Sequence, residues 1–303
     1  AITSNKLLSG LTTLGVVIGI TFVILTGWAL KGLDAALEKT ISVIGTDVVY
    51  VDKYDWAGGK RWSETRNRKD ITMDQAEKLI ERISSAQLAV PSVRRWSNTV
   101  KYGNQYLEGI TVIGTTSEYA GIAVGNIDQG RFFSPLEDTY RTYVTVLAYN
   151  VAQTLFPNRD AIGQTIKIKG VPFTVIGTIE KQGTLLMDFI DNQVYVPLRV
   201  FFSMYGSDRS VTVAVRAGSE ARLPEVRLET IGLMRQIRNL RPDEPIDFSL
   251  NESQAFRDSI AQIRLTVWGV GICMTVLSFI VGIIGIMNIM FVSVTELTKE
   301  IGI

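Results

Sequence analysis

The feature that most constrains this chain is a run of residues near its end, 265–295, that contains no charged side chain. At about 1.5 Å of rise per residue, such a run forms a helix of roughly 46 Å. A bilayer core needs only about 20 apolar residues to be crossed. The run therefore predicts a helix that crosses a membrane and projects beyond it, and we place the span at residues 265–294.

A second uncharged run covers residues 11–30, near the other end of the chain. It is too long for the apolar core of a typical signal peptide and has no small-residue cleavage pattern at its end. Trp28 and Lys31 at its end suit the interface between bilayer and water. We predict a first membrane span at 11–30, with a buried helix of a soluble protein as the alternative.

Glycines inside both runs indicate helices that pack closely against other helices. Gly15 and Gly19 form a GxxxG pair in the first run, and Gly282 and Gly285 lie in the second. In lipid, small residues let two helix backbones approach, and close packing then stabilises the pair. We expect these four glycines at helix–helix contacts, either within the chain or across a dimer.

The composition argues against several classes of function. The chain of 303 residues carries 31 basic and 30 acidic side chains, so its net charge of +1 gives no argument for nucleic acid binding. Histidine is absent, which removes the usual base of a serine triad and the commonest metal ligand. Cys273 is the one cysteine, and no GxxxxGK[ST] phosphate-binding loop is present. We expect no catalytic, cofactor-binding or metal-binding residues, with a carboxylate-dyad hydrolase as the remaining enzymatic alternative.

The region between the two runs has the pattern of a compact α+β domain over residues 46–250. Strands are predicted where β-branched and aromatic residues alternate with polar ones, and helices where apolar residues recur every three or four positions. The predicted strands are 46–51, 93–102, 106–114, 143–147, 165–168, 173–179, 193–196, 210–216 and 246–250, and the predicted helices are 72–85, 150–155 and 223–240. The basic segment 56–70 is predicted to be a loop, either solvated or docked to a partner.

Helical segments are predicted to connect this domain to both spans. Apolar residues at helical spacing predict a stalk at 31–45. Asn251 is a favourable N-cap with Gln254 three residues later, which predicts a second stalk at 251–264. Neither segment is a flexible Gly/Ser linker, so we expect a displacement of the spans to reach the domain with little loss.

The last seventeen positions, 287–303, carry the phrase MNIMFVSVTELTKEIGI. This phrase resembles the end of the second membrane helix in permeases of the MacB type of ABC transporter, which usually have arginines where this chain has Leu297 and Lys299. Several phrases of the predicted domain resemble the periplasmic core of the same family. They are 114–116 with Tyr119, 130–133, 155–163, 176–177 and 196–198. The resemblance covers nearly the whole chain.

The resemblance implies a topology that the sparse charges beside the spans do not fix. It implies a MacB periplasmic core-like domain outside the cytoplasm, carried by a multi-pass protein of the bacterial inner membrane. Residues 1–10 are then a cytoplasmic flank, and 295–303 begin a cytoplasmic segment that leads to two further membrane helices, which this fragment lacks. We assign a coupling role at the cytoplasmic end to Asn288, Glu296, Lys299 and Glu300.

The resemblance also implies a function, namely the permease subunit of a MacB-like ABC transporter for efflux of drugs, peptides or other substrates. Such a permease transmits motion driven by ATP hydrolysis to its outer domain. The implied partners are a second copy of the chain, membrane lipid and a cytoplasmic ATPase subunit that carries ATP and Mg²⁺. A three-part pump adds a periplasmic adaptor and an outer-membrane channel. The alternatives are a lipoprotein-releasing permease, a permease that activates cell-wall hydrolases, and a two-span membrane sensor.

Overall fold

The computed structural model describes residues 6–56, 65–122, 125–157, 159–183, 188–300 and 302. The chain divides into two compact units. The first unit joins residues 1–37 to 257–303, and the second covers residues 38–256. Most of the segment 56–70, which the sequence predicts to be a loop, lies outside the described residues.

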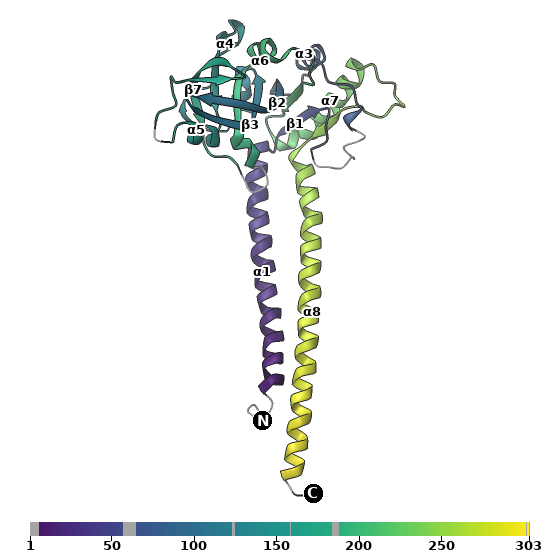
Figure 1. The fold of residues 1–303 in the computed structure, drawn as a ribbon. Helices are drawn as coiled ribbons and strands as arrows, with labels where there is room; N and C mark the ends of the chain where they lie inside the picture. Colours follow the sequence, from purple (N-terminus) through teal and green to yellow (C-terminus); the bar gives the residue numbers. More distant parts are fainter. Residues whose placement is uncertain are drawn as a thin grey trace. The chain divides into compact units, whose positions relative to one another are not determined.

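The first unit is formed by two long helices, α1 (Lys6–Ile44) and α8 (Ser253–Glu300), which also extend into the second unit (Figure 1). Both are long and apolar enough to cross a membrane. Each continues from a predicted span through most of its predicted stalk, and no proline interrupts either helix. The places where these helices enter and leave a bilayer stay a prediction.

The predicted cap of the second long helix is wrong. Asn251 belongs to strand β10 (Ser249–Asn251), and α8 begins two residues later, at Ser253. The Asn251 amide nitrogen donates to the Tyr54 carbonyl over 2.9 Å, and its amide oxygen accepts from the Trp56 N–H over 2.9 Å. The Asn251 side chain therefore makes a tertiary contact with a segment almost two hundred residues away and is not the cap of α8.

The second unit is built on one mixed sheet of ten strands in the order β10-β1-β9-β2-β3-β8-β5-β7-β4, with β6 pairing with β2 and β7. The remaining strands are β1 (Val48–Asp52), β2 (Leu88–Tyr102), β3 (Gln105–Thr115), β4 (Ile127–Gly130), β5 (Val144–Leu147), β6 (Thr165–Ile168), β7 (Val171–Ile179), β8 (Gln193–Pro197) and β9 (Thr212–Arg216). The pairs β3–β8 and β5–β7 are parallel, and the other pairs are antiparallel. The long strand β2 links the halves of the sheet, because it pairs with β9, β3 and β6.

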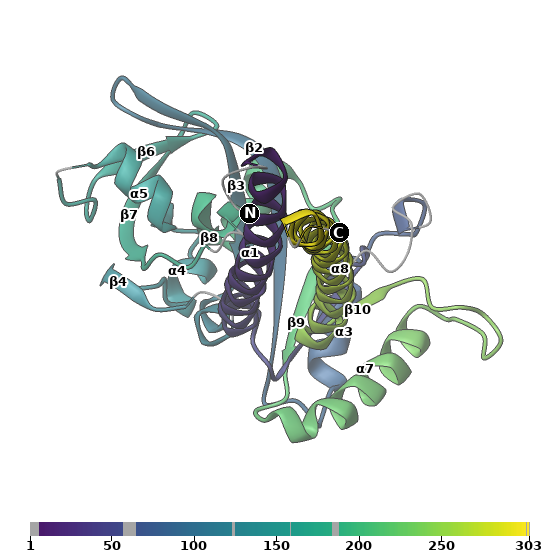
Figure 2. The same ribbon diagram turned by 90° about the horizontal axis from the view of Figure 1, so that it is seen from below.

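Helices pack against the sheet, and its central strands are buried on both faces. They are α3 (Met73–Arg82), α5 (Tyr149–Leu155), α6 (Leu198–Tyr205) and α7 (Leu223–Ile237), while α4 (Pro135–Thr139) contacts α6. Figures 1 and 2 both show α3 beside α7. Three 3₁₀ turns complete the described elements, η1 (Ser117–Gly121), η2 (Asp188–Asn192) and η3 (Glu220–Arg222).

Strand β1 shows how the sheet is buried on both faces. Val49 and Val51 belong to the large core under the helices, whereas Val48 and Tyr50 belong to a smaller cluster on the opposite face. Alternate residues of a strand point to opposite faces. A strand covered on both faces therefore reads as a continuous apolar run, such as the VVYV of β1.

The predicted α+β class is confirmed, and each predicted strand overlaps an observed one. Strand β4 and helices α4 and α6 were not predicted. Strand β2 begins before the predicted start at 93, so Pro91 lies inside it, opposite Val213 of β9. Its carbonyl accepts a hydrogen bond from the Thr115 hydroxyl over 2.8 Å. Proline can occupy a strand position where no N–H is needed by the ladder.

Gly114 permits the close approach of α6 to the sheet. A Cβ atom at this position would lie 2.4 Å from Cβ of Phe201, which is fully buried. Gly130 and Gly177 are a similar case, since they are paired across β4 and β7. A Cβ on Gly177 would lie 2.3 Å from the Arg131 carbonyl oxygen. These glycines belong to the phrases that resemble the MacB family, and their role in the fold is packing.

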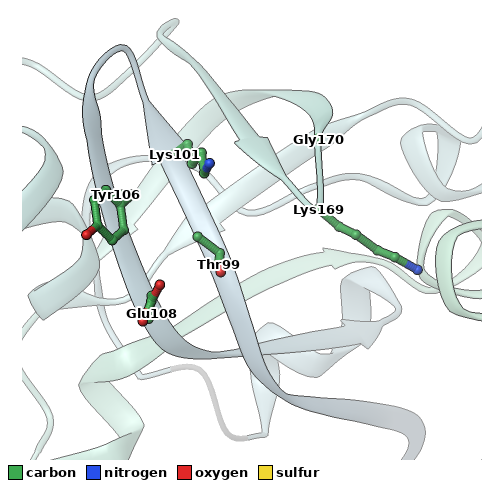
Figure 3. Close-up of a pocket in the computed structure, with 6 residues that line it drawn as sticks. All are labelled: Thr99, Lys101, Tyr106, Glu108, Lys169 and Gly170. Atoms are coloured by element: carbon green, nitrogen blue, oxygen red, sulfur yellow. The ribbon is translucent and has the colours of Figure 1, made fainter.

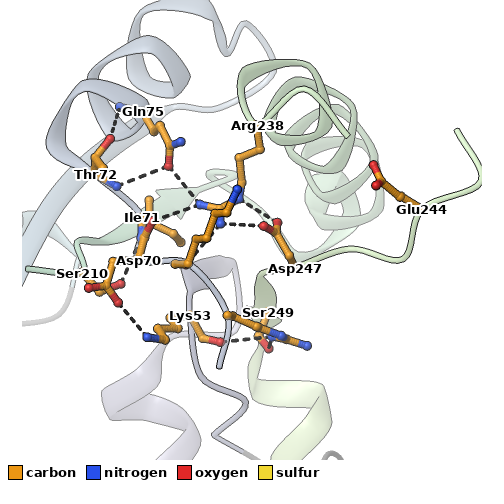
Figure 4. Close-up of polar contacts among 12 residues, drawn as sticks. Lys53, Asp70, Ile71, Thr72, Gln75, Ser210, Arg238, Glu244, Asp247 and Ser249 are labelled. Atoms are coloured by element: carbon orange, nitrogen blue, oxygen red, sulfur yellow. Dashed lines mark hydrogen bonds and ion pairs between the residues drawn. The ribbon is translucent and has the colours of Figure 1, made fainter. Parts of the chain in front are cut away.

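Arg238 connects the end of α7 to the start of α3 (Figure 4). Its side chain is 2% exposed and makes two hydrogen bonds of 2.7 Å to the Asp247 carboxylate. The same guanidinium donates to Gln75 Oε1 over 2.9 Å and to the carbonyls of Asp70 and Lys69. A guanidinium has five donors in one plane, which suits this meeting of three segments.

Replacing Arg238 by alanine should lower the free energy of unfolding by about 2–3 kcal/mol, because hydrogen bonds between charged groups are lost. Arg241→Ala is the matched control, since the Arg241 side chain is 74% exposed. The measurement is thermal unfolding of the full chain in mild detergent. Equal unfolding temperatures for the two variants would contradict this role of Arg238.

Glu229 on α7 forms hydrogen bonds with the segment that follows α3. Its carboxylate accepts hydrogen bonds from the N–H and hydroxyl groups of both Ser84 and Ser85. Burial by itself raises the pKa of Glu229, but the hydrogen bonds from Ser85 and Ser84 stabilise the ionised form and lower the pKa from 4.5 to about 2. The folded state therefore favours the ionised carboxylate more strongly than the unfolded chain does.

The stabilisation by Glu229 should be complete above a pH of about 4.5 and should be lost as the pH falls toward 2. Between these pH values the free energy of unfolding of the wild type should fall by about 1 kcal/mol more than that of Glu229→Gln. The difference is small because solvent screens a partly exposed carboxylate. Thermal unfolding as a function of pH measures this difference. Glu225→Gln, at a side chain that is 65% exposed, should keep the pH dependence of the wild type. An unchanged pH dependence in Glu229→Gln would disprove the assignment.

Candidate functional site

The strongest candidate for a functional site is the interface between α1 and α8 within the first unit. Figures 1 and 2 show the two helices side by side. Their contacts pair Gly15 with Gly282, Gly19 with Ser278, and Thr26 with Gly271. The residue numbers rise along one helix as they fall along the other, so the helices are antiparallel.

Each helix has one stripe of less exposed residues along its length. On α1 the stripe is Gly15, Gly19, Phe22, Thr26, Leu30, Leu33 and Leu37, and on α8 it is Ile260, Val267, Gly271, Thr275, Ser278, Gly282 and Gly285. Successive members are three or four residues apart, except for the seven residues from Ile260 to Val267, and this spacing is typical of two helices that pack along a continuous seam. The stripes therefore define a helix seam, the name used below for these two sets of residues.

The α8 side of the helix seam consists mostly of small residues. A Cβ atom on Gly271 would lie 2.8 Å from the Thr26 methyl group, and one on Gly19 would lie 2.9 Å from Cβ of Ser278. Contacts below 3.0 Å are too short for carbon atoms, so at these positions only glycine fits without a shift. The Thr275 hydroxyl donates to the Gly271 carbonyl of its own helix over 2.7 Å, so its hydrogen bond is satisfied inside the helix.

The outward faces of the same helices are apolar and exposed. Leu14, Ile20, Leu25, Phe279 and Ile284 are each at least half exposed. Water would make such faces unfavourable, whereas the acyl chains of a bilayer would cover them at no cost. These faces are those expected of a helix pair in lipid.

Aromatic and charged residues mark one end of the apolar region. The register of the helix seam places Trp28 and Trp268 at the same level, and both are exposed, at 71% and 54%. Asp34 and Arg264 form an ion pair about two turns farther along α1. Tryptophan is enriched where a bilayer meets water, and charged residues follow outside. The structure thus adds Trp268 to the interfacial position that the sequence assigned to Trp28.

The residues that the sequence predicts as a site are distributed as follows. Gly15, Gly19 and Gly282 lie at contacts between α1 and α8, and Gly285 is half-buried on the same stripe. The sequence marks Gly269 and Gly271, like Gly282 and Gly285, as small residues suited to packing, but the contacts predicted above include only Gly282 and Gly285 from this run. The recurrence of small residues at 271, 275, 278 and 282 was the available signal, because these positions share one helix face.

The predicted coupling segment lies at the far end of α8. Its residues are Asn288, Glu296, Lys299 and Glu300. Their backbone belongs to the helix, but their side chains lie outside the described part of the structure. The predicted coupling role therefore stays a prediction. Among the described residues, no group of three or more His, Cys, Asp or Glu is placed to hold a metal ion.

Both long helices are fixed at their ends within the second unit. The last turns of α1 bury Ile41 and Ile44, and the Tyr50 hydroxyl donates to the Ile44 carbonyl over 2.8 Å. At the start of α8, Ser253 is 5% exposed, directly after strand β10. Only residues 45–47 separate α1 from β1. The helices are therefore joined to the sheet by short, packed segments.

Comparison with known proteins identifies relatives along the whole chain. Residues 9–231 match the family described as MacB-like periplasmic core domain. A macrolide export ATP-binding/permease protein MacB from Bdellovibrio bacteriovorus is 30% identical over 308 residues, which cover 99% of this chain and 46% of that protein. A pyoverdine export ATP-binding/permease protein PvdT from Pseudomonas syringae pv. tomato is 28% identical, covering 99% of this chain and 44% of that protein. The chain spans less than half the length of these curated relatives.

Solved structures show the same fold. The periplasmic region of MacB from Actinobacillus actinomycetemcomitans matches with a TM-score of 0.60 at 19% identity, over 73% of this chain and 95% of that chain. The extracellular domain of YknZ, described as a noncanonic ABC-type transporter from Gram-positive bacteria, matches with a TM-score of 0.52 at 18% identity. It covers 69% of this chain and 100% of that chain. At these identities the likeness establishes the fold alone.

Gly19→Leu and Gly271→Leu should each lower the stability of the helix pair by about 1–3 kcal/mol, because the added side chains overpack a filled interface. Gly27→Leu and Gly269→Leu are matched controls on the same helices, since a Cβ atom at either position meets nothing within 4 Å. Thermal unfolding of the full chain in mild detergent compares the four variants. Controls that are destabilised as strongly as the seam variants would refute the proposed packing.

Proposed function

The chain belongs to the MacB-like periplasmic core domain family, and we propose on this premise that it is the permease part of an ABC-type exporter. In this proposal the α1–α8 pair crosses the bacterial inner membrane, and the second unit lies outside the cytoplasm. ATP hydrolysis in the cytoplasm moves the helices, and the helices move the outer domain. The observation that carries the proposal is the family match together with two relatives whose names include export and ATP-binding/permease.

The charge distribution of the helices favours a mechanical role. The uncharged runs at residues 7–30 and 265–295 contain no ionisable side chain except Cys273. Ion and proton paths through membranes are usually marked by ionisable residues inside the spans. We therefore propose that these helices transmit motion, and that neither protons nor transported substrate pass along them.

The joints between helices and sheet suit such transmission. The α1 helix ends among buried residues of the second unit, and α8 begins directly after β10. A flexible linker would absorb a displacement, whereas short packed joints pass it on. The helix seam keeps α1 and α8 together while they move, because its glycines allow the two backbones to approach closely.

The proposed partners follow from the names and the lengths of the relatives. Those proteins are called ATP-binding/permease proteins, and this chain covers 46% and 44% of two of them. We propose that an ATP-binding component, carrying ATP and Mg²⁺, acts with this chain either as a separate subunit or as part of the same polypeptide. We further propose that two copies of the permease work together, with a periplasmic adaptor and an outer-membrane channel if the exporter is a three-part pump.

The proposal predicts that ATP changes the distance between the outer domains of two copies. A spin label at Tyr140→Cys reports on this distance, because Tyr140 is 76% exposed and Cys273 can be replaced by serine. The full-length protein with its ATP-binding component is measured by pulsed electron spin resonance, with and without ATP and vanadate. We expect a distance between two labels that shifts when the nucleotide is trapped.

The matched control replaces the phosphate-loop lysine of the ATP-binding component, which should abolish both ATP hydrolysis and the shift. The Gly19→Leu variant should hydrolyse ATP but show a smaller shift, because its helix seam is overpacked. Two results argue against the proposal. They are the absence of any ATPase activity in the purified full-length protein, and a distance between the two labels that is the same with and without the nucleotide.

A further inference from the structure

A cationic groove on the second unit is not explained by the proposed transport function. It consists of two adjoining cavities of about 450 and 330 Å³ that share Thr99 and Lys169 in their walls. The larger cavity lies between the β2–β3 hairpin and the turn at Lys169-Gly170, and its wall contains one acidic residue, Glu108, besides Lys101 and Lys169 (Figure 3). The smaller cavity continues toward α6 and is lined by Arg95, Ser97, Asn98, Thr99, Lys169, Met204, Tyr205 and Arg209.

The smaller cavity has three cationic side chains and no carboxylate in its wall. Arg95 comes from β2, Lys169 from the β6–β7 turn, and Arg209 from the segment after α6. Within the part of the chain that the structure describes, none of the three forms an ion pair. Like charges brought together without a counter-charge repel one another, so the fold maintains this arrangement at a cost.

Arg209 has an unused hydrogen-bond donor in this wall. Its Nε atom is buried and has no hydrogen-bond partner among the described residues. A buried N–H group without a partner costs free energy that an acceptor would recover. The positive charge of the Arg209 guanidinium in the cavity wall favours an anionic acceptor.

Tyr205 lines the same cavity as the three cations. Its hydroxyl donates to Asn98 Oδ1 over 2.8 Å, and the Lys169 ammonium lies 5.1 Å from the centre of its ring. Burial raises the pKa of Tyr205, while the positive charges of Arg95 and Arg209 partly offset that rise. Arg95, Arg209 and Tyr205 all belong to the wall of the smaller cavity, so a group bound there lies beside all three.

The backbone of β2 is irregular where this strand lines the cavity. Its pairing with β3 shifts register between Arg95 and Asn98, and Ser97 has a φ of +56° in the left-handed region. Such bulges re-aim side chains at functional positions of a sheet.

We propose that the cavity beside Tyr205 is a binding site for a small soluble ligand that carries an oxyanion, either a phosphate or a carboxylate group. Arg209 and Arg95 bind the oxyanion through their N–H groups, Lys169 adds a point charge, and the hydroxyls of Ser97 and Thr99 complete the polar wall. Met204 and Tyr205 supply the apolar surface for the rest of the ligand. This site does not depend on the transport proposal.

The test is isothermal titration of the full chain in mild detergent with two probes, inorganic pyrophosphate and citrate, at physiological ionic strength. At least one probe should bind saturably with one site per chain. Arg209→Gln should weaken that binding by about tenfold or more, since it removes a charge-assisted hydrogen bond. Arg95→Gln is a second variant at an exposed position, and it should weaken binding even if Arg209→Gln fails to fold.

The matched control is Arg82→Gln, which removes the same charge from an exposed position at the end of α3. It should leave the affinity within about twofold, because long-range charge effects are screened beyond about 8 Å. Preference for pyrophosphate over citrate would assign a phosphate ligand, and the reverse preference would assign a carboxylate. Absence of saturable binding for both probes would overturn the proposal, as would an equal loss in Arg82→Gln.

Discussion

The close approach of α1 and α8 is the contact on which the first unit depends. Two helices in lipid gain no hydrophobic stabilisation from each other, so they associate through packing. Gly19 and Gly271 permit this packing, because a methyl group at either position would lie less than 3 Å from the partner helix. The outward faces of both helices remain apolar, as a bilayer requires. The two helices are thus packed together without any charged side chain in the runs 11–30 and 265–295.

The second unit depends on a different constraint, because its sheet must be covered on both faces. Apolar side chains of β1 alternate between the core under the helices and the cluster on the opposite face. Polar links then fix the covering helices at their ends, as Arg238 does between α7 and α3. The helices from the first unit end and begin within this packed frame. The frame therefore holds its surface side chains in a fixed geometry.

The cationic groove uses that fixed geometry. Arg95, Lys169 and Arg209 are far apart in sequence and are brought together by β2, the β6–β7 turn and the end of α6. The wall of the smaller cavity contains these three cations and no carboxylate, which is the observation on which the proposed oxyanion site rests.

The sequence by itself determined the two long helices, the α+β class and the positions of most strands, because these follow from local periodicity and charge. It also predicted Gly15, Gly19 and Gly282, which lie at the helix seam. Only the tertiary structure decided the pairing of β2 with three strands, the role of Asn251 in β10 and the membership of Gly271 in the seam. The cationic groove was equally inaccessible to sequence reasoning. Each of these features joins residues that are distant along the chain, and local patterns contain no information about which distant segments will meet.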